Sequence, residues 1–151
     1  MIWVSFMIEF RHIGLYVADL PKMEAFYANA FNMKVIRKQI ETSDVLVDSI
    51  IRPGASITFS KLITPRGVAT GVGDMVELIH YENNGIESQL LPVYLVGQGH
   101  IGFGVDDIES VVKAIVLFGG TLQSAIVQIG SNQCCFCTDP ENNWIELIQN
   151  G

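Results

Sequence analysis

The chain has 151 residues, of which 49% are hydrophobic, and its nine Lys and Arg against sixteen Asp and Glu give a net charge of −7. This length suffices for one well-packed domain or for two small modules that share a core. The negative charge argues against a nucleic-acid partner, because phosphate backbones are bound by basic patches. The sequence has no apolar run of about 18 residues and no signal-peptide pattern at its start. We therefore expect a cytoplasmic protein with a small-molecule partner and no membrane partner.

The first half of the chain predicts the order β-α-β-(short α)-β-β. Apolar and β-branched patterns indicate four strands, at 10–17, 33–40, 56–63 and 75–81. Asp19 is a suitable N-cap, and Pro21 a suitable first-turn residue, for a helix of about ten residues. A short helix is expected at 43–51, and a glycine-containing loop at 64–73.

After a polar and then Leu- and Pro-containing connection, the second half predicts β-α-β-β-β. The expected strands are at 100–105, 121–129, 133–138 and 144–148. Asp107 is a suitable N-cap for the helix after the first of these strands, and Gly119 and Gly120 are expected to end that helix. The second half thus repeats the element order of the first.

Short motifs repeat as well. The residues His12, Ile13, Gly14, Val17 and Asp19 recur 88 positions later as His100, Ile101, Gly102, Val105 and Asp107. Glu77-Leu78-Ile79 recurs 69 positions later as Glu146-Leu147-Ile148. Each half therefore has one histidine on its first predicted strand and one glutamate on its last. A repeat at fixed offsets indicates two related structural units.

These four residues, His12, Glu77, His100 and Glu146, are the candidate metal ligands. Each alone would be ordinary, but two imidazoles and two carboxylates around one divalent cation form a neutral site. Gly14 shares a strand face with His12, and we expect the glycine to leave open volume in front of the imidazole. His80 lies on the opposite strand face from Glu77 and is expected to have a non-ligand role.

The three cysteines, Cys134, Cys135 and Cys137, lie together in one predicted strand. A C-x-x-C spacing is compatible with a redox pair or half of a zinc site. However, the chain has no second cysteine pair to complete a structural zinc site, and strand alternation points Cys134 and Cys137 to opposite faces. We expect buried, reduced cysteines in a reducing compartment.

The order of these motifs resembles the vicinal oxygen chelate superfamily, which includes glyoxalases, bleomycin-resistance proteins and extradiol dioxygenases. The matching segments are His12-x-Gly-x-x-Val-x-Asp-Leu, Phe26-Tyr27, Val76-Glu77-Leu78, Gly99-His100-x-x-Phe-x-Val-x-Asp-Ile and Asp139-Pro140-x-x-Asn143-x-Ile145-Glu146-Leu147. The resemblance implies an α+β fold in which two βαβββ modules form a U-shaped mixed sheet around a metal site. It implies one domain over 1–151, with modules at 7–82 and 99–149 and a linker at 83–98.

Within the superfamily, a His/Glu/His/Glu ligand set is most similar to that of glyoxalase I. Two imidazoles disfavour Mg²⁺ and Ca²⁺ and favour Zn²⁺, Ni²⁺, Co²⁺, Fe²⁺ or Mn²⁺. The expected reaction is that of a lyase or isomerase, a proton transfer adjacent to a carbonyl through a metal-stabilised enediolate. The resemblance favours Glu146 as the base that moves the proton, with Glu77 as the second base. The resemblance also implies that the two modules of a chain close their own site or swap with those of a partner, so the site lies inside one chain or between two. Because the exposed strands of an isolated module would be a liability, we expect a homodimer.

Two departures argue against glutathione as a cosubstrate. Glutathione-using members resemble one another in carrying an Arg four residues beyond the first ligand, where this chain has Tyr16. Their Asn-Trp-Gly stretch has no counterpart at 79–84. A substrate with adjacent oxygens, such as another α-hydroxycarbonyl compound or an acyl thioester, fits as well. Two alternatives stay open, namely an iron-dependent extradiol-type dioxygenase and a non-catalytic binding or resistance protein.

Overall fold

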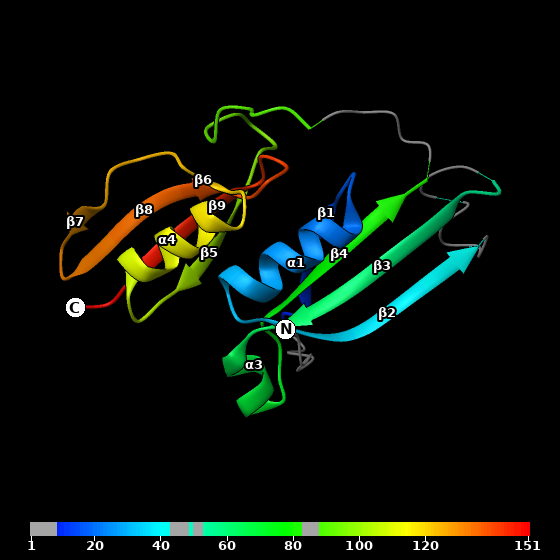
Figure 1. Cartoon of the computed structure of the whole chain (residues 1–151), viewed down its shortest axis with the longest axis horizontal. Coiled ribbons are helices and arrows are strands. Elements are labelled where there is room, and N and C mark those ends of the chain that lie inside the picture. The colour runs from blue at the N-terminus through cyan, green and yellow to red at the C-terminus, as the bar shows by residue number, and fades with distance from the viewer. Residues whose placement is uncertain (1–8, 43–48, 50–52, 83–87) are drawn as a thin grey trace, which may run out of the picture.

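The chain forms two sheets that lie next to each other, each accompanied by a helix (Figure 1). The structure is a computed structural model that describes residues 9–42, 49, 53–82 and 88–151. The first sheet has the strand order β1-β4-β3-β2, with bounds β1 (His12–Tyr16), β2 (Lys34–Thr42), β3 (Ser56–Ile63) and β4 (Met75–Tyr81). β1 and β4 are parallel, and the other neighbours are antiparallel.

The second sheet repeats this arrangement with the order β5-β9-β8-β6, while β7 also pairs with β8. Its strands are β5 (His100–Gly104), β6 (Thr121–Leu122), β7 (Val127–Ile129), β8 (Asn132–Thr138) and β9 (Trp144–Gln149). β5 and β9 are parallel, as β1 and β4 are in the first sheet. The predicted α+β class is therefore confirmed.

Both long helices begin where the sequence predicted. Asp19 caps α1 (Leu20–Ala30) by accepting a hydrogen bond from the Lys22 backbone N–H at 3.0 Å. Asp107 caps α4 (Ile108–Leu117) in the same way, accepting from the Ser110 backbone N–H at 3.0 Å. These side chains satisfy backbone donors that would otherwise lack partners in the first turn.

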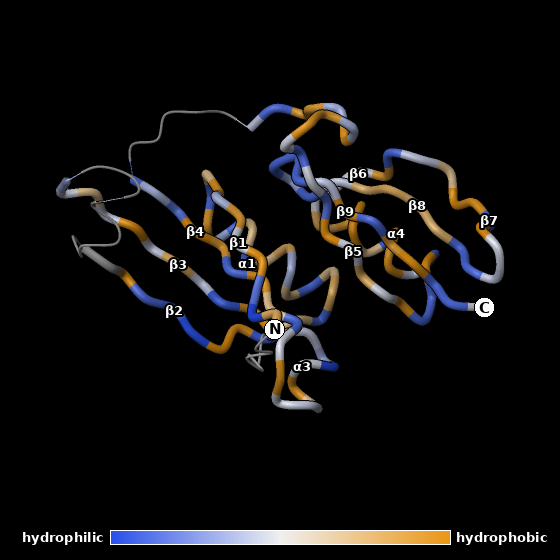
Figure 2. The backbone as a smooth tube through the Cα atoms, turned by 180° about the vertical axis from the view of Figure 1, so that it is seen from behind, coloured by the Kyte–Doolittle hydropathy of each residue, from blue (hydrophilic) through white to orange (hydrophobic). Residues whose placement is uncertain are grey.

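One hydrophobic core joins the two halves. Its largest fully buried side chains are Met23, Phe26, Tyr27, Leu62, Leu78, Ile108, Ile115, Ile145 and Leu147. The rings of Phe31 and Phe103, one from each half, stack with centroids 4.4 Å apart. Hydrophobic and hydrophilic stretches are mixed along β2 and β3 (Figure 2). Leu62, Val76 and Leu78 on one face of the first sheet are buried in this core, while the opposite face carries the partly exposed Lys61 and Glu77.

The turn at 139–143 ties the second half to the first. The Glu141 carboxylate accepts hydrogen bonds from the backbone N–H groups of Ala18 and Asp19, each at 2.7 Å. The buried Asp139 carboxylate accepts one from the Tyr27 hydroxyl at 2.9 Å. Burial raises the pKa of Asp139, and burial together with the Asp139 charge raises the pKa of Tyr27 well above its ordinary value. These contacts hold both the start of α1 and its later residue Tyr27 against the turn between β8 and β9.

Three local predictions need correction or lie outside the described residues. The expected loop at 64–73 contains α3 (Pro65–Thr70), which Thr64 caps and which ends at Gly71 with φ 72°. The expected strand at 121–129 is divided into β6 and β7, because the Gln123 and Ser124 N–H groups both donate to the Phe136 carbonyl. The short helix predicted at 43–51 falls outside the described residues except for Ser49. No helix in the described part of the chain has the length and apolarity needed to cross a membrane.

Candidate metal half-sites

The first candidate pair of ligands lies on the open face of the first sheet. The parallel register of β1 and β4 sets Gly14 opposite Glu77, and His12 lies two residues before Gly14 on the same strand face. His12 Nε2 is 2.8 Å from Glu77 Oε2. Both side chains are partly exposed, at 34% and 14% of their surface. The predicted pairing of one imidazole with one carboxylate is therefore formed within the first half.

The second half builds the same arrangement. Gly102 lies opposite Glu146 in the parallel register of β5 and β9, and His100 Nε2 is 3.1 Å from Glu146 Oε2. The sequence repeat is thus also a repeat in three dimensions, with the same register between histidine, glycine and glutamate in each sheet. We name His12 with Glu77 the first half-site, and His100 with Glu146 the second half-site.

Each half-site has a glycine directly opposite its glutamate, on the strand that carries its histidine. A Cβ atom on Gly102 would lie 3.9 Å from Glu146 Oε2, an ordinary contact distance, whereas one on Gly14 would lie 3.4 Å from Ile79 Cδ1. Because the strands run parallel, the histidine side chain reaches diagonally past the glycine to the glutamate on the next strand. The Glu77 carboxylate, 2.8 Å from His12 Nε2, therefore lies next to the imidazole for which open volume was predicted.

The two half-sites stay apart within one chain. Among the described residues, no group of three or more His, Cys, Asp and Glu side chains is close enough to hold a metal ion. Each half-site therefore offers one nitrogen and one oxygen ligand, which is half of the set predicted for His12, Glu77, His100 and Glu146.

The neighbours of the two glutamates differ sharply in charge. In β3, Lys61 lies opposite Glu77, and its Nζ is 3.2 Å from Glu77 Oε1. In β8, Phe136 lies opposite Glu146, and its ring meets that of His100 edge to face with centroids 5.4 Å apart. Sequence reasoning missed both residues. The signal for Lys61 was present, since it is the one charged residue in the strand Ser56–Ile63.

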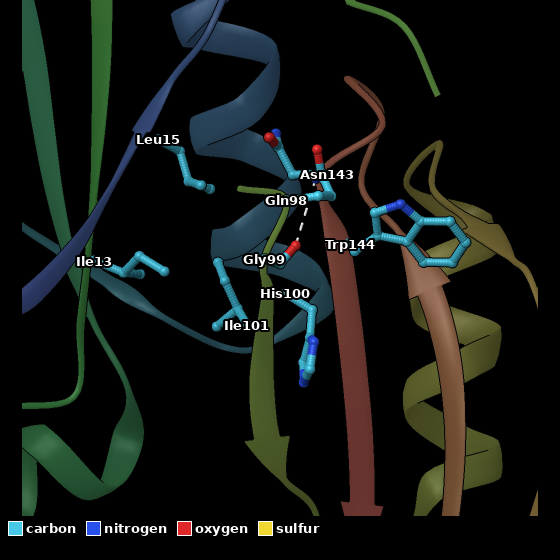
Figure 3. Close-up of a pocket in the computed structure, with 8 residues that line it drawn as sticks. All are labelled: Ile13, Leu15, Gln98, Gly99, His100, Ile101, Asn143 and Trp144. Carbon is cyan, nitrogen blue, oxygen red and sulfur yellow. Dashed lines mark hydrogen bonds between the residues drawn. The ribbon is translucent and has the colours of Figure 1, made fainter. Parts of the chain in front are cut away.

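A pocket of about 190 Å³ lies beside the second half-site, between β1 and β5 (Figure 3). Its lining comprises Ile13, Leu15, Gln98, Gly99, His100, Ile101, Asn143 and Trp144. Figure 3 shows Ile13 and Leu15 extending from β1 toward the second half, with His100 pointing along β5 away from Leu15. Of the four predicted ligands only His100 lines this pocket, so the pocket is not a site shared by both half-sites.

The remaining singled-out residues have structural partners or surroundings. The His80 ring Nδ1 lies 3.1 Å from the Val17 carbonyl, on the side of β4 away from Glu77. Cys134, Cys135 and Cys137 are buried and unpaired, as predicted. Tyr16, which stands where glutathione-using relatives carry Arg, is 58% exposed on the same strand face as His12.

Residues 9–147 match the model of the Glyoxalase/Bleomycin resistance protein/Dioxygenase superfamily. The chain therefore belongs to this superfamily, as its motifs predicted.

A probable lactoylglutathione lyase of Vibrio cholerae is 30% identical over 143 residues, covering 92% of this chain and 88% of that protein. The lactoylglutathione lyase of Schizosaccharomyces pombe is 28% identical over 93% of this chain. The chain spans only 47% of that yeast protein and 45% of a Brassica oleracea relative.

Solved structures share the fold. A glyoxalase family protein from Bacillus cereus superimposes with a TM-score of 0.85 at 16% identity, with 99% of both chains covered. A fosfomycin resistance protein from Listeria monocytogenes, solved as a mutant with Mn(II), gives 0.63 at 18% identity, covering 94% of this chain and 90% of that one. At these identities the likeness concerns the fold alone. Glyoxalase I from Zea mays gives 0.64 at 25% identity, with 95% of this chain and 45% of that one covered.

Proposed function

We propose that this protein is a divalent-metal-dependent lyase or isomerase of the glyoxalase I type, which transfers a proton adjacent to a carbonyl group. His12, Glu77, His100 and Glu146 would hold the metal. The observation that carries this proposal is the repeated histidine–glutamate pair, formed in the same strand register in both sheets. The lactoylglutathione lyases among the relatives, at about 30% identity, support the reaction class.

The donor set fits a transition metal. Each half-site presents an imidazole Nε2 and a carboxylate oxygen within 3.1 Å of each other, so both atoms can turn toward one ion. Nitrogen and oxygen donors together suit Zn²⁺, Ni²⁺, Co²⁺, Fe²⁺ or Mn²⁺ better than Mg²⁺ or Ca²⁺. When bound, such an ion acts as a Lewis acid that stabilises negative charge on substrate oxygens.

Glu146 would act as the base that moves the proton. Its flanking side chains Phe136 and Trp144 are aromatic, and their rings pack edge to face with centroids 6.1 Å apart. The Glu146 side chain stays 25% exposed beside these rings, so its carboxylate can reach a substrate carbon and exchange a proton with it. Glu77, held from the other side by Lys61, would act as the second base.

We further propose that the complete site forms between two copies of the chain. Each chain has two half-sites that do not meet, so the first half-site of one copy would face the second half-site of its partner. A two-fold symmetric dimer would then contain two equivalent four-ligand sites.

The free cysteines and the small-molecule chemistry also fit a protein of the cytoplasm.

Mixing two damaged chains tests this assembly. One variant carries His12→Ala and Glu77→Gln, and the other carries His100→Ala and Glu146→Gln. If the sites form between chains, each variant alone binds no metal, but a refolded equimolar mixture regains about a quarter of the parent's sites, because about half of the dimers are mixed and one of their two sites is intact. Atomic-absorption measurement after gel filtration gives the bound metal. Recovery of none would contradict a site between chains.

The substrate class needs a separate screen. The metal-loaded protein is incubated with hemithioacetals of glutathione, hemithioacetals of smaller thiols, acyl-CoA thioesters and catechols. Proton exchange at the carbon next to the carbonyl, followed by NMR in deuterated water, is the expected result for at least one carbonyl substrate. Oxygen uptake with a catechol on the iron-loaded protein would instead indicate an extradiol-type dioxygenase. Metal-independent ligand binding without turnover would indicate a binding or resistance protein.

A further inference from the structure

One row of side chains crosses the open face of the first sheet beside the first half-site. In the strand register, Arg37 on β2 lies opposite Lys61 on β3, Lys61 lies opposite Glu77 on β4, and Glu77 lies opposite Gly14 on β1. The row therefore contains two neighbouring cations and then the candidate metal ligand. Neighbouring strands are about 4.8 Å apart, so all three charged groups lie within reach of one small molecule.

The two cations of this row share one aromatic neighbour. The Arg37 guanidinium carbon and Lys61 Nζ each lie 5.5 Å from the centroid of the Phe59 ring, which is only 5% exposed. Like charges directly opposite on neighbouring strands repel each other and destabilise a sheet. Cation–ring contacts offset part of this cost and hold both groups above the same ring.

Among the described side chains, a single carboxylate contacts this pair. Within the described side chains, Arg37 has no carboxylate partner and donates from Nε to the neutral side-chain oxygen of Gln39 at 3.1 Å. Lys61 has one carboxylate neighbour, Glu77. The chain as a whole has a net charge of −7, so two neighbouring cations on this face differ from the negative character of the rest of the chain.

A bound metal would increase the positive charge of this surface. A divalent ion is neutralised by the two glutamates of a complete site, which leaves Lys61 and Arg37 with a combined charge of +2. The second half-site contributes no further cation there, because Phe136 occupies the place that Lys61 has in the first. A charged group that binds next to Lys61 and Arg37 and balances their charge of +2 has to be an anion.

We infer that Arg37 and Lys61 form a subsite for an anionic group of the substrate, a carboxylate or another acidic oxygen group, carried a few bonds from the metal-binding oxygens. This inference rests on the proposed metal-dependent function. The substrate would therefore be a small anionic carbonyl compound.

A pair of matched hydroxamates tests the inference by binding alone. Butyrohydroxamic acid and succinohydroxamic acid have the same chain length and the same metal-chelating group, but only the second carries a carboxylate at its far end. Calorimetric titration of the metal-loaded full chain should give at least about tenfold tighter binding for succinohydroxamate, the effect of one or two charge-assisted hydrogen bonds. The difference should shrink as salt is added.

Variants separate the subsite from general charge effects. Arg37→Met and Lys61→Met should each remove most of the preference for succinohydroxamate, while Lys61→Arg should keep it. Lys113→Met, which removes a cation from the exposed surface of α4, should leave the preference unchanged. Butyrohydroxamate affinity in each variant reports whether the metal site is intact.

The possible failures are distinguishable. Equal affinity of the two hydroxamates for the parent protein would overturn the anion subsite while leaving the metal site standing. A preference that survives in Arg37→Met and Lys61→Met together would overturn it as well. If neither hydroxamate binds to protein incubated with the metals named above, the proposed metal site fails, and the anion subsite fails with it.

Discussion

Lys61 and Phe136 hold equivalent places in the two sheets, since each lies opposite the glutamate of its half-site in an antiparallel strand pair. The first glutamate thus has a cation 3.2 Å away, whereas the second has an aromatic wall. The two half-sites have the same pair of candidate ligands but therefore differ in environment. A complete site would join a charged side from one half to an apolar side from the other, which gives an asymmetric substrate a fixed orientation.

This asymmetry leads to a prediction for Glu146. Replacing it with Gln keeps the shape of the side chain but removes the proton acceptor, so turnover should fall by at least about 100-fold. The free energy of unfolding of the metal-free protein should stay within about 0.5 kcal/mol of the parent, because Glu146 is partly exposed and pairs only with His100 among the described residues. Steady-state kinetics and urea denaturation measure the two effects. Equal turnover in parent and variant would remove Glu146 from the mechanism.

Glu141 should matter for stability rather than for chemistry. Its carboxylate accepts two hydrogen bonds of 2.7 Å from backbone N–H groups at the start of α1, and Glu141→Ala leaves both donors without this partner. We expect a loss of about 1.5–3 kcal/mol in the free energy of unfolding. Glu109→Ala is the matched control, since Glu109 is exposed and lies 4.0 Å from Lys113. Urea denaturation of both variants checks the prediction, which a Glu141→Ala protein as stable as Glu109→Ala would contradict.

The Tyr27 and Asp139 pair predicts a pH dependence. Burial raises the pKa of Asp139 in the folded protein above its unfolded value, so the folded state binds its proton more tightly and loses stability as pH rises through that raised pKa. The Tyr27 hydrogen bond opposes this shift by stabilising the ionised carboxylate. Tyr27→Phe should therefore cost about 1.5–3 kcal/mol at pH 7.

The cost of Tyr27→Phe should become smaller as the pH falls and Asp139 takes up its proton in the folded state. Urea denaturation of parent and variant over a series of pH values from 7 to 4 measures this trend. Phe26→Leu, which alters the adjacent core residue without touching the carboxylate, serves as control and should show a pH-independent cost. A Tyr27→Phe cost that is constant or grows toward acid would show that the hydrogen bond does not stabilise the ionised form.

Cys135 and Cys137 should be unreactive in the folded protein. Burial raises the pKa of Cys137 to about 12 and also raises the pKa of Cys135. At pH 8 a thiol with that pKa is ionised in only about one molecule in 10,000, and the thiolate is the reactive form. Iodoacetamide should therefore modify these two thiols far more slowly in the native protein than in urea, where all three cysteines of the chain should react. Intact-mass spectrometry counts the modified thiols, and rapid native labelling at Cys135 or Cys137 would contradict their burial.

Much of the fold could be predicted from local patterns. Asp19 and Asp107 cap their helices as expected, because an N-cap acts through hydrogen bonds to residues two or three positions away. Where a prediction failed, contacts from outside the segment decided the structure. The expected strand at 121–129 is interrupted because two of its N–H groups bind the carbonyl of Phe136, a residue on β8.

The sequence by itself determined the repeat, and with it the choice of His12, Glu77, His100 and Glu146 and the α+β fold. Those features depend on residue identity and period, which are local. Only the tertiary structure decided that each histidine pairs with the glutamate of its own sheet, that the two pairs stay apart in one chain, and that Lys61 lies beside Glu77. The physical reason is strand register: side chains from distant positions become neighbours only through the pairing of strands, and a single sequence does not state which residues face each other across a sheet.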